Sequence, residues 1–135
     1  MKRKTLAVLL ALCLLLCGCK GRPLPGGMDE AALLQAGQDV VLLLVDGDYE
    51  AVYAALRDDV AAGTSAEDIA ALAESQLKGM GGYRQITDRM TTGQSSGGED
   101  YGVAVFYCEF SKDTALFRLA FDQEQRLIGL EIQKQ

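Results

Sequence analysis

Four cysteine thiols are the most reactive side chains of this 135-residue chain, which contains no histidine. Cys13, Cys17 and Cys19 lie close together near the amino terminus, whereas Cys108 lies far away in the second half. A thiol can pair in a disulfide, act as a nucleophile or carry a lipid. The segments around the cysteines decide between these uses.

The first 18 residues have the three parts of a secretory signal peptide. Lys2, Arg3 and Lys4 form a basic start, the uncharged run "LAVLLALCLLL" follows, and the small residue Gly18 ends the segment. A transmembrane helix needs roughly 20 apolar residues, and this run is too short and is followed at once by cations. We therefore predict a lipoprotein-type signal peptide over residues 1–18.

Leu16-Cys17-Gly18-Cys19 resembles the bacterial lipobox, in which a cysteine thiol receives diacylglycerol before the signal is cut. In this resemblance Leu16 takes the leucine position, Gly18 the small residue before the cut, and Cys19 the modified cysteine. Cys17 stands where Ala, Ser or Thr is usual. Neither Cys17 nor Cys13 replaces Cys19 well, because a leucine would then stand at the cleaved bond. Cys19 is the predicted lipid anchor; the alternative is an ordinary signal peptide with apolar cysteines.

A lipid on Cys19 predicts a mature protein on the extracytoplasmic side of the cell membrane. Two or more acyl chains bind a membrane stably, at about 0.8 kcal/mol per buried methylene. The mature chain would have 117 residues (135 less 18) and keep 10 of the 13 cations and all 19 acids, a net charge of −9. An anionic membrane repels such a body slightly, and nucleic acid binding needs a basic face. The lipid must therefore hold the protein, and nucleic acid is excluded as a partner.

The mature chain divides into a tether and one domain. "KGRPLPGGM" contains two prolines and three glycines without a periodic pattern, so residues 19–28 are the predicted lipidated cysteine and tether. Residues 29–135 form the predicted domain. Within it Cys108 has no partner for a disulfide, and burial as a small apolar residue is expected.

The first half of the domain has apolar residues at helical spacing. Three helices are expected, over residues 28–45, over 49–62, and from Thr64 to about Met80. Gly47 can end the first helix in the left-handed conformation, and Asp48 can cap the second. "TSAED" offers a capping box for the third helix.

The second half changes to strand-like segments rich in β-branched and aromatic residues. These are "YRQITDRM", "YGVAVFYCEF", "DTALFRLAFD" and "RLIGLEIQK", and "TTGQSSGGED" between the first two is expected to be a loop. Short turns at 112–113 and 123–124 predict an antiparallel meander. With two-residue turns, Tyr107 falls opposite Arg118, and Arg118 opposite Gly129.

This pattern predicts an α+β fold, with three N-terminal helices packed on a curved, cone-like antiparallel sheet of about four strands. The helices must cover the apolar face of the sheet, because nothing else can bury it. That face carries Phe106, Cys108, Phe110, Phe117, Leu119, Phe121, Ile128, Leu130 and Ile132.

The opposite face of the sheet carries Tyr107, Glu109, Arg118 and Glu131. Carboxylates around an arginine can perform acid–base chemistry. On an open sheet face they more often form solvated cross-strand pairs, and a dimer contact is the other interpretation. These four residues are therefore a candidate outer contact surface.

Tyr49, Tyr53 and Tyr83 are candidates for the mouth of a pocket, with core packing as the alternative. Two further motifs are explained as turns. "DGD" at 46–48 lacks the alternating ligands of a calcium loop, and "GMGG" at 79–82 follows a helix where a phosphate loop precedes one. We therefore predict no metal and no cofactor.

Helices followed by a meander ending in "LAFDQEQRLIGLEI" resemble the cystatin-like, nuclear-transport-factor-2-like superfamily. "DGDYEAVYAAL", "TSAEDIAAL" and the closing "FD…RLIGL" are similar to a domain of unknown function found in bacterial lipoproteins. The resemblance implies helices folded over a curved sheet that can enclose a pocket. It implies no activity, because fold alone does not give function.

Three functions follow from these observations. The first is a membrane-anchored, non-enzymatic domain that binds a small apolar ligand or an envelope protein. The second is a structural or regulatory lipoprotein whose open sheet face forms a homodimer or docks a partner. The third is an enzyme that uses carboxylates without histidine, and the absence of histidine and of any nucleophile motif makes it the weakest.

Overall fold

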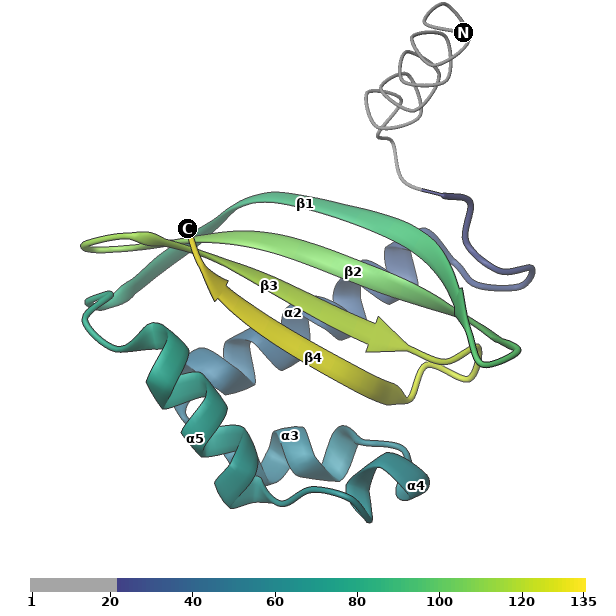
Figure 1. The fold of residues 1–135 in the computed structure, drawn as a ribbon. Coiled ribbons are helices and arrows are strands. Elements are labelled where there is room, and N and C mark those ends of the chain that lie inside the picture. The colour runs from purple at the N-terminus through teal and green to yellow at the C-terminus, as the bar shows by residue number, and fades with distance from the viewer. Residues whose placement is uncertain (1–21) are drawn as a thin grey trace, which may run out of the picture.

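The computed structural model describes residues 22–135. The predicted signal peptide, with Leu16 and Gly18, and the predicted lipid-attachment residue Cys19 lie outside the described residues. Figure 1 shows two layers, a curved sheet and a set of helices packed on one of its faces. The predicted α+β fold class is confirmed.

The helical layer comes first in the chain and the sheet second. The elements are α2 (Glu30–Asp46), α3 (Tyr49–Ala55), α4 (Asp58–Ala61), α5 (Ala66–Leu77), β1 (Tyr83–Ser96), β2 (Glu99–Phe110), β3 (Thr114–Phe121) and β4 (Leu127–Lys134). The four strands are antiparallel and lie in the order β1-β2-β3-β4. No helix of residues 22–135 is long and apolar enough to span a membrane.

Local side-chain signals set the helix ends. The Asp29 carboxylate accepts a hydrogen bond from the Ala32 amide at 3.0 Å and caps α2, and Gly47 ends this helix with φ of 77°. Asp48 caps α3, as expected from the sequence. For α5 the cap is Ser65, whose hydroxyl accepts from the Asp68 amide. The start of the third helix was thus predicted to within one residue.

The second expected helix is divided into α3 and α4. Leu56 and Arg57 between them are extended, with ψ of 143° and 145°. The Arg57 amide donates to the Leu127 carbonyl at 2.9 Å, and Leu56 bridges to the same residue. Two residues of the helical layer therefore bond to the sheet, which interrupts the helix.

The prediction of a loop at residues 91–100 is wrong, because β1 and β2 form a long hairpin there. Ser96 pairs with Glu99, and the pairing continues without a break as far as Asp88 and Tyr107. Gly97 and Gly98 form the turn, with φ of 58° and 81°. Positive φ at both central residues is what a two-residue type I′ turn requires. The Gly-Gly pair was the hairpin signal in a segment otherwise read as polar loop.

The predicted register between β2 and β3 is wrong by two residues. Tyr107 lies opposite Leu116, and Arg118 lies opposite Val105. The turn comes one residue earlier than expected, since the Phe110 amide donates to the Asp113 carbonyl at 2.8 Å. An even shift leaves every side chain on its predicted face.

Between β3 and β4 the predicted register is also wrong. Arg118 lies opposite Glu131 instead of Gly129. The loop is longer than two residues and contains Gln125 in the left-handed conformation, with φ of 62°. This geometry is common in three-residue hairpin loops.

An irregularity in the pairing of β3 with β4 changes one predicted core position. Leu127 pairs with Phe121 and is fully buried, whereas Ile128, the expected core residue, is only partly buried. The other inner-face predictions on β2 and β3 are confirmed. They are Phe106, Cys108, Phe110, Phe117, Leu119 and Phe121.

The interior between the layers is filled by side chains. Phe106, Phe117 and Leu33 are fully buried there. Gly37 of α2 faces the sheet so closely that an added Cβ would lie 2.6 Å from the Phe106 ring. A core packed to this density leaves little room for a ligand between α2 and the sheet.

Candidate functional site

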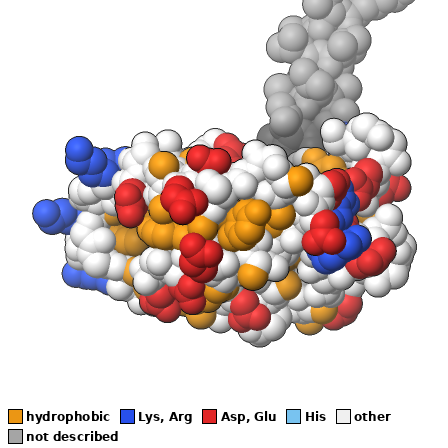
Figure 2. All heavy atoms as spheres, turned by 90° about the horizontal axis from the view of Figure 1, so that it is seen from below, with side chains coloured by type: hydrophobic (Ala, Val, Ile, Leu, Met, Phe, Trp, Pro, Cys, Tyr) orange, Lys and Arg blue, Asp and Glu red, His pale blue; other side chains and the backbone are white. Residues whose placement is uncertain are grey.

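A cleft opens where the carboxyl ends of α2 and α5 meet the start of β1. It has a volume of about 420 Å³, and its walls include Tyr49, Leu77, Tyr83 and Phe110. Figure 2, seen from the helical side, shows a stripe of hydrophobic side chains bordered by acidic ones on this face of the molecule. The walls of the cleft combine apolar and aromatic side chains with three charged ones, Asp46, Glu74 and Lys78.

The two tyrosines of the cleft are placed by the ends of secondary-structure elements. Tyr49 is the first residue of α3, directly after its Asp48 cap, and Tyr83 is the first residue of β1. The Tyr83 ring lies edge-on to that of Phe110, with the ring centroids 5.8 Å apart and the planes at 72°. Aromatic pairs prefer such edge-to-face contacts. The pair gives one wall of the cleft a fixed shape.

The segment before Tyr83 is held by the turn between β2 and β3. The Lys112 amide donates to the Met80 carbonyl and the Ser111 amide to the Gly82 carbonyl, at 2.9 and 2.8 Å. Met80 itself is fully buried. Gly81 has φ of 82°, a conformation that favours glycine. These contacts fix the position of the backbone that leads into Tyr83.

Both tyrosines of the cleft have raised pKa values. For Tyr49 the main cause is burial of the phenol, and the negative charge of Glu74 adds to it. For Tyr83 burial is again the main cause. Both phenols are therefore neutral at ordinary pH, and the charged lining residues are Asp46, Glu74 and Lys78.

The third predicted pocket residue, Tyr53, is not among the residues that line the cleft. Its hydroxyl donates to the Ala61 carbonyl at 3.1 Å and so ties α3 to α4. All three tyrosines pack against the main core, so the core-packing alternative describes Tyr53 and also holds in part for Tyr49 and Tyr83. The structure brings Tyr49 and Tyr83 together and leaves Tyr53 out.

Three of the four predicted outer-face residues take part in two ion pairs on the face of the sheet that no described helix covers. Arg118 lies opposite Glu131, with nitrogen and oxygen 4.0 Å apart, and Glu109 lies 3.6 Å from Arg84. The four side chains of these two ion pairs are each at least a third exposed, and such pairs contribute little to stability. Tyr107 packs beside them on an apolar cluster. The interpretation as cross-strand pairs describes this geometry.

That second apolar cluster was not predicted from the sequence. Val103, Val105 and Leu116 are each less than a tenth exposed, and the partly buried side chains packed on them are Met90, Tyr101, Tyr107 and Ala120. Next to the cluster is a hollow of about 210 Å³, with Arg118 and Glu131 among its walls and with Gly129 providing no side chain. β2 is apolar on both faces, so its sequence does not alternate and did not indicate a second cluster on the outer face.

An ionic cluster that the sequence analysis did not identify lies at the other end of the sheet. The Arg57 guanidinium donates to Glu99 at 2.6 Å, to Asp59 at 2.7 Å and to Asp122 at 3.3 Å. Arg57 follows α3, Glu99 begins β2 and Asp122 follows β3. The cluster therefore ties the helical layer to two turns of the sheet.

Asp122 is the buried member of this ionic cluster, with only 4% of the residue exposed. Its carboxylate accepts hydrogen bonds from the amides of Glu124 and Arg126, at 3.0 and 2.8 Å. Burial opposes ionisation of Asp122, but the Arg126 amide and the Arg57 guanidinium outweigh it and hold its pKa below the usual value. The hydrogen bond from Arg57 likewise lowers the pKa of Asp59. The carboxylates of Asp59 and Asp122 therefore stay ionised and hydrogen-bonded, which indicates a role in stabilising the fold and not in catalysis.

The sequence contained part of this information. An aspartate directly after a strand, as in "FDQEQR", is typical of a turn whose side chain accepts backbone amides. Nothing local marks Arg57, which is 65 residues from Asp122.

Cys108 is fully buried, as expected, and burial raises its pKa to about 12. Within residues 22–135 no group of three or more Cys, Asp or Glu side chains is arranged to hold a metal ion.

A family model for proteins of unknown function, DUF3887, matches residues 38–130. The chain belongs to this family. The matched range includes the cleft residues and the ionic cluster, so both lie within the part that the family shares. No curated protein matches the chain.

A solved structure has a similar fold. It is the NMR structure of a protein from Ruminococcus gnavus ATCC 29149, with a TM-score of 0.70 and 17% sequence identity. The alignment covers 82% of this chain and 96% of that one. At this identity the likeness shows a shared fold only.

Proposed function

We propose that this member of the DUF3887 family is a membrane-anchored extracytoplasmic lipoprotein with a non-enzymatic binding domain. Leu16, Gly18 and Cys19 support the anchor through their resemblance to the lipobox. The resemblance to cystatin-like lipoprotein domains agrees with a binding role. In this proposal the cleft takes a small apolar ligand or an apolar group of an envelope protein.

The observation that carries the binding role is the cleft with its two neutral tyrosines. Its volume of about 420 Å³ falls in the range of small-molecule sites, roughly 300–1,000 Å³. Leu77 and Phe110 add apolar surface, while Glu74 lies near the Tyr49 phenol. Such a cleft favours an occupant that is apolar and that carries no negative charge.

A second candidate function is docking through the uncovered face of the sheet. The cluster of Val103, Val105 and Leu116 supports it, because it places apolar surface beside Tyr107 and Arg118. Tyrosine and arginine are enriched in protein interfaces. A second copy of the chain or an envelope protein would be the partner.

The carboxylates favour a non-enzymatic role. A general acid near neutral pH needs a raised pKa, and the pKa values of Asp59 and Asp122 are lowered. Glu109 and Glu131 lie in exposed ion pairs. Each of these four acids thus has a structural explanation.

Two measurements test the proposed function. The intact mass of the protein from the membrane fraction should show a diacylglyceryl group, and a Cys19→Ser variant should lose both the group and the membrane association. Native mass spectrometry of residues 20–135, purified without detergent, should show an additional mass that leaves on denaturation. The buried core residues all lie within this segment.

A matched pair of leucine variants assigns the bound mass to the cleft. Leu77→Gln changes the cleft wall, and Leu42→Gln changes an exposed leucine of α2, 37% exposed, that is not among the cleft residues. The additional mass should decrease in the first variant only. A bare monomer in every sample would contradict ligand binding, and a bare dimer would favour the docking function.

A further inference from the structure

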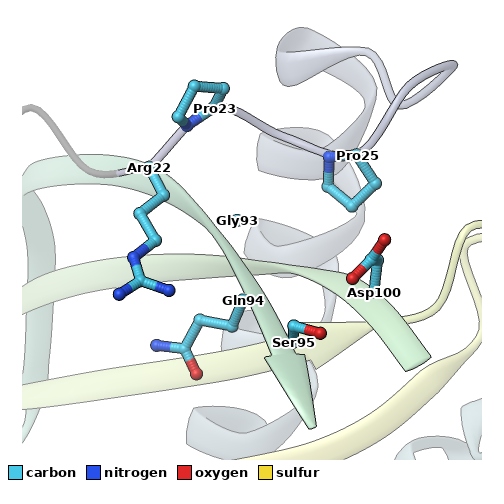
Figure 3. A pocket seen from close by; sticks show the side chains of 7 residues that line it. All are labelled: Arg22, Pro23, Pro25, Gly93, Gln94, Ser95 and Asp100. Atoms are coloured by element: carbon cyan, nitrogen blue, oxygen red, sulfur yellow. The ribbon is translucent and has the colours of Figure 1, made fainter. Parts of the chain in front are cut away.

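Residues 22–28, predicted as a tether, lie against the sheet and are called the strap here. The Gly93 amide donates to the Arg22 carbonyl at 2.9 Å, and the Arg22 amide donates to the Thr92 hydroxyl at 2.9 Å. Leu24 and Met28 pack on the main core. Figure 3 shows the strap passing beside β1 near Gly93 and continuing towards the side of Asp100. The strap is bonded to an edge strand and anchored in the core.

Two glycines that face each other across β1 and β2 make room for the strap. Gly93 pairs with Gly102. A Cβ added at Gly93 would collide with the Pro23 carbonyl oxygen and would lie 3.3 Å from the Leu24 Cα. A Cβ added at Gly102 would lie 2.9 Å from the Met28 methyl group. A side chain at Gly93 would collide with the backbone of the strap, whereas one at Gly102 would press on Met28 of the strap and equally on Leu33 of α2.

The strap lies at the opposite end of β1 from the cleft. Gly93 and Tyr83 are ten residues apart on that strand. Their partners on β2, Phe110 and Gly102, are eight residues apart, because β1 has two irregularities in this stretch. At about 3.3 Å per residue, the strap contact and the cleft are about 26 Å apart.

The strap also begins close to the predicted lipid. Arg22 follows Cys19 by three positions, which span at most about 11 Å when extended. If Cys19 carries diacylglycerol, the strap end of the domain lies directly on the bilayer, without a long spacer.

Charge separates the two layers of the domain. Residues 29–77, which hold all the described helices, contain 11 acids and a single cation, Arg57. Residues 78–135, which hold the sheet, contain 8 acids and 7 cations. An anionic bilayer repels the helical layer far more than the sheet, and Lys20 and Arg22 beside the anchor favour contact at the strap.

We propose that the domain rests on an anionic bilayer through the strap and the neighbouring edge of β1, with the acidic helical layer and the cleft turned to the aqueous phase. This inference rests on the proposed lipid anchor. The cleft then receives its occupant from the aqueous side of the envelope and not from the bilayer.

The orientation can be measured by energy transfer, because the chain contains no tryptophan. One tryptophan is introduced as Ser96→Trp, at the turn beside the strap, or as Ser75→Trp, on α5 beside the cleft; both serines are exposed. The lipidated protein is placed in vesicles of phosphatidylglycerol and phosphatidylethanolamine with a dansyl lipid as acceptor. Transfer from Ser96→Trp should be several-fold more efficient than transfer from Ser75→Trp. Equal or reversed efficiencies would overturn the orientation.

A pair of glycine variants tests the role of the strap. In Gly93→Ala the nearest atoms to the new methyl group all belong to the strap, whereas in Gly129→Ala the nearest is the Ala120 methyl at an ordinary 3.7 Å. Gly93→Ala should speed hydrogen exchange in peptides covering 22–28 and reduce the difference between the two tryptophan positions. Gly129→Ala should leave both unchanged. An unaltered transfer difference in Gly93→Ala despite faster exchange would show that the strap does not orient the domain.

The anchor and the orientation fail in distinguishable ways. An intact mass without lipid on Cys19 would overturn both, and it is read before vesicles are added. A lipidated protein with equal transfer from the two tryptophans would overturn the orientation alone and leave the lipoprotein proposal standing.

Discussion

The two ends of the sheet differ in how their polar groups are satisfied. At the ionic end, Arg57 joins Glu99 and Asp122, and the buried carboxylate also accepts two backbone amides. At the cleft end, Tyr49 and Tyr83 present neutral aromatic surface to a hollow that is open to solvent. The side chains of the ionic end join the helical layer to the sheet. Those of the cleft end line a hollow that a ligand can reach.

Because of this difference, the residues that stabilise the fold and the residues proposed to bind a ligand lie at opposite ends of the same strand, β2. β2 begins at the ionic end with Glu99 and ends in the cleft with Phe110. A change at one end should therefore act mainly on the property of that end, since distant sites without shared partners act additively. Four variants or conditions test this separation.

The largest effect is expected for Asp122→Ala. This change leaves the amides of Glu124 and Arg126 without their acceptor and removes a partner of Arg57. Hydrogen bonds to charged groups are worth about 1.5–3 kcal/mol, so the free energy of unfolding should fall by about 2–3 kcal/mol in urea denaturation. Glu124→Ala, in the same turn but exposed, should change it by less than about 0.5 kcal/mol. Similar losses in both variants would contradict a special role for Asp122.

The next effect concerns acid stability. The pKa values of Asp122 and Asp59 are lowered in the folded state, so their stabilisation is present above the ordinary aspartate pKa of about 3.9 and is lost as pH falls through the folded values. Between about pH 5 and about pH 3 the free energy of unfolding should fall less in Asp122→Ala than in the parent chain. Urea denaturation at the two pH values measures this. Parallel slopes would show that other carboxylates dominate the acid response.

A smaller effect is expected for Tyr83→Ala in the cleft. Loss of the ring and of its contact with Phe110 should weaken binding of the neutral apolar dye Nile red about tenfold, or about 1.4 kcal/mol. The free energy of unfolding should fall by about 1 kcal/mol, in the range of aromatic pair contacts. Dye fluorescence titration measures the affinity. Tyr107→Ala on the outer face is the control and should leave dye affinity unchanged; an equal loss there would place the dye elsewhere.

The smallest effect is expected for Glu74→Gln. The negative charge of Glu74 helps raise the pKa of Tyr49, so its removal should lower that pKa towards the ordinary value without changing stability. Spectrophotometric titration of the tyrosines follows the ionisation. Glu67→Gln, an exposed acid on the same helix, is the matched control. An unchanged tyrosine titration in Glu74→Gln would show that the charge of Glu74 does not act on Tyr49.

The sequence predicted elements whose determinants lie within a few residues of one another. The caps at Asp48 and Gly47, and the alternation that buries Phe106 and Cys108, were all read correctly because neighbouring residues determine them. The even error in register did no harm to the faces, since side chains alternate with a period of two. The lipobox at Cys19 is likewise a local pattern, and it stays a prediction.

Only the tertiary structure decided which distant residues meet. Arg57 reaches Asp122 across 65 positions, and the strap reaches Thr92 across 70, because the helical layer and the strap pack on the sheet and bring those segments together. Leu127 replaces Ile128 in the core through an irregularity in strand pairing, which depends on the loop before it. The candidate site depends on the same kind of contact. Tyr49 and Tyr83 are local in origin, but the cleft between them exists because the end of α5, the start of β1 and Phe110 at the end of β2 come together.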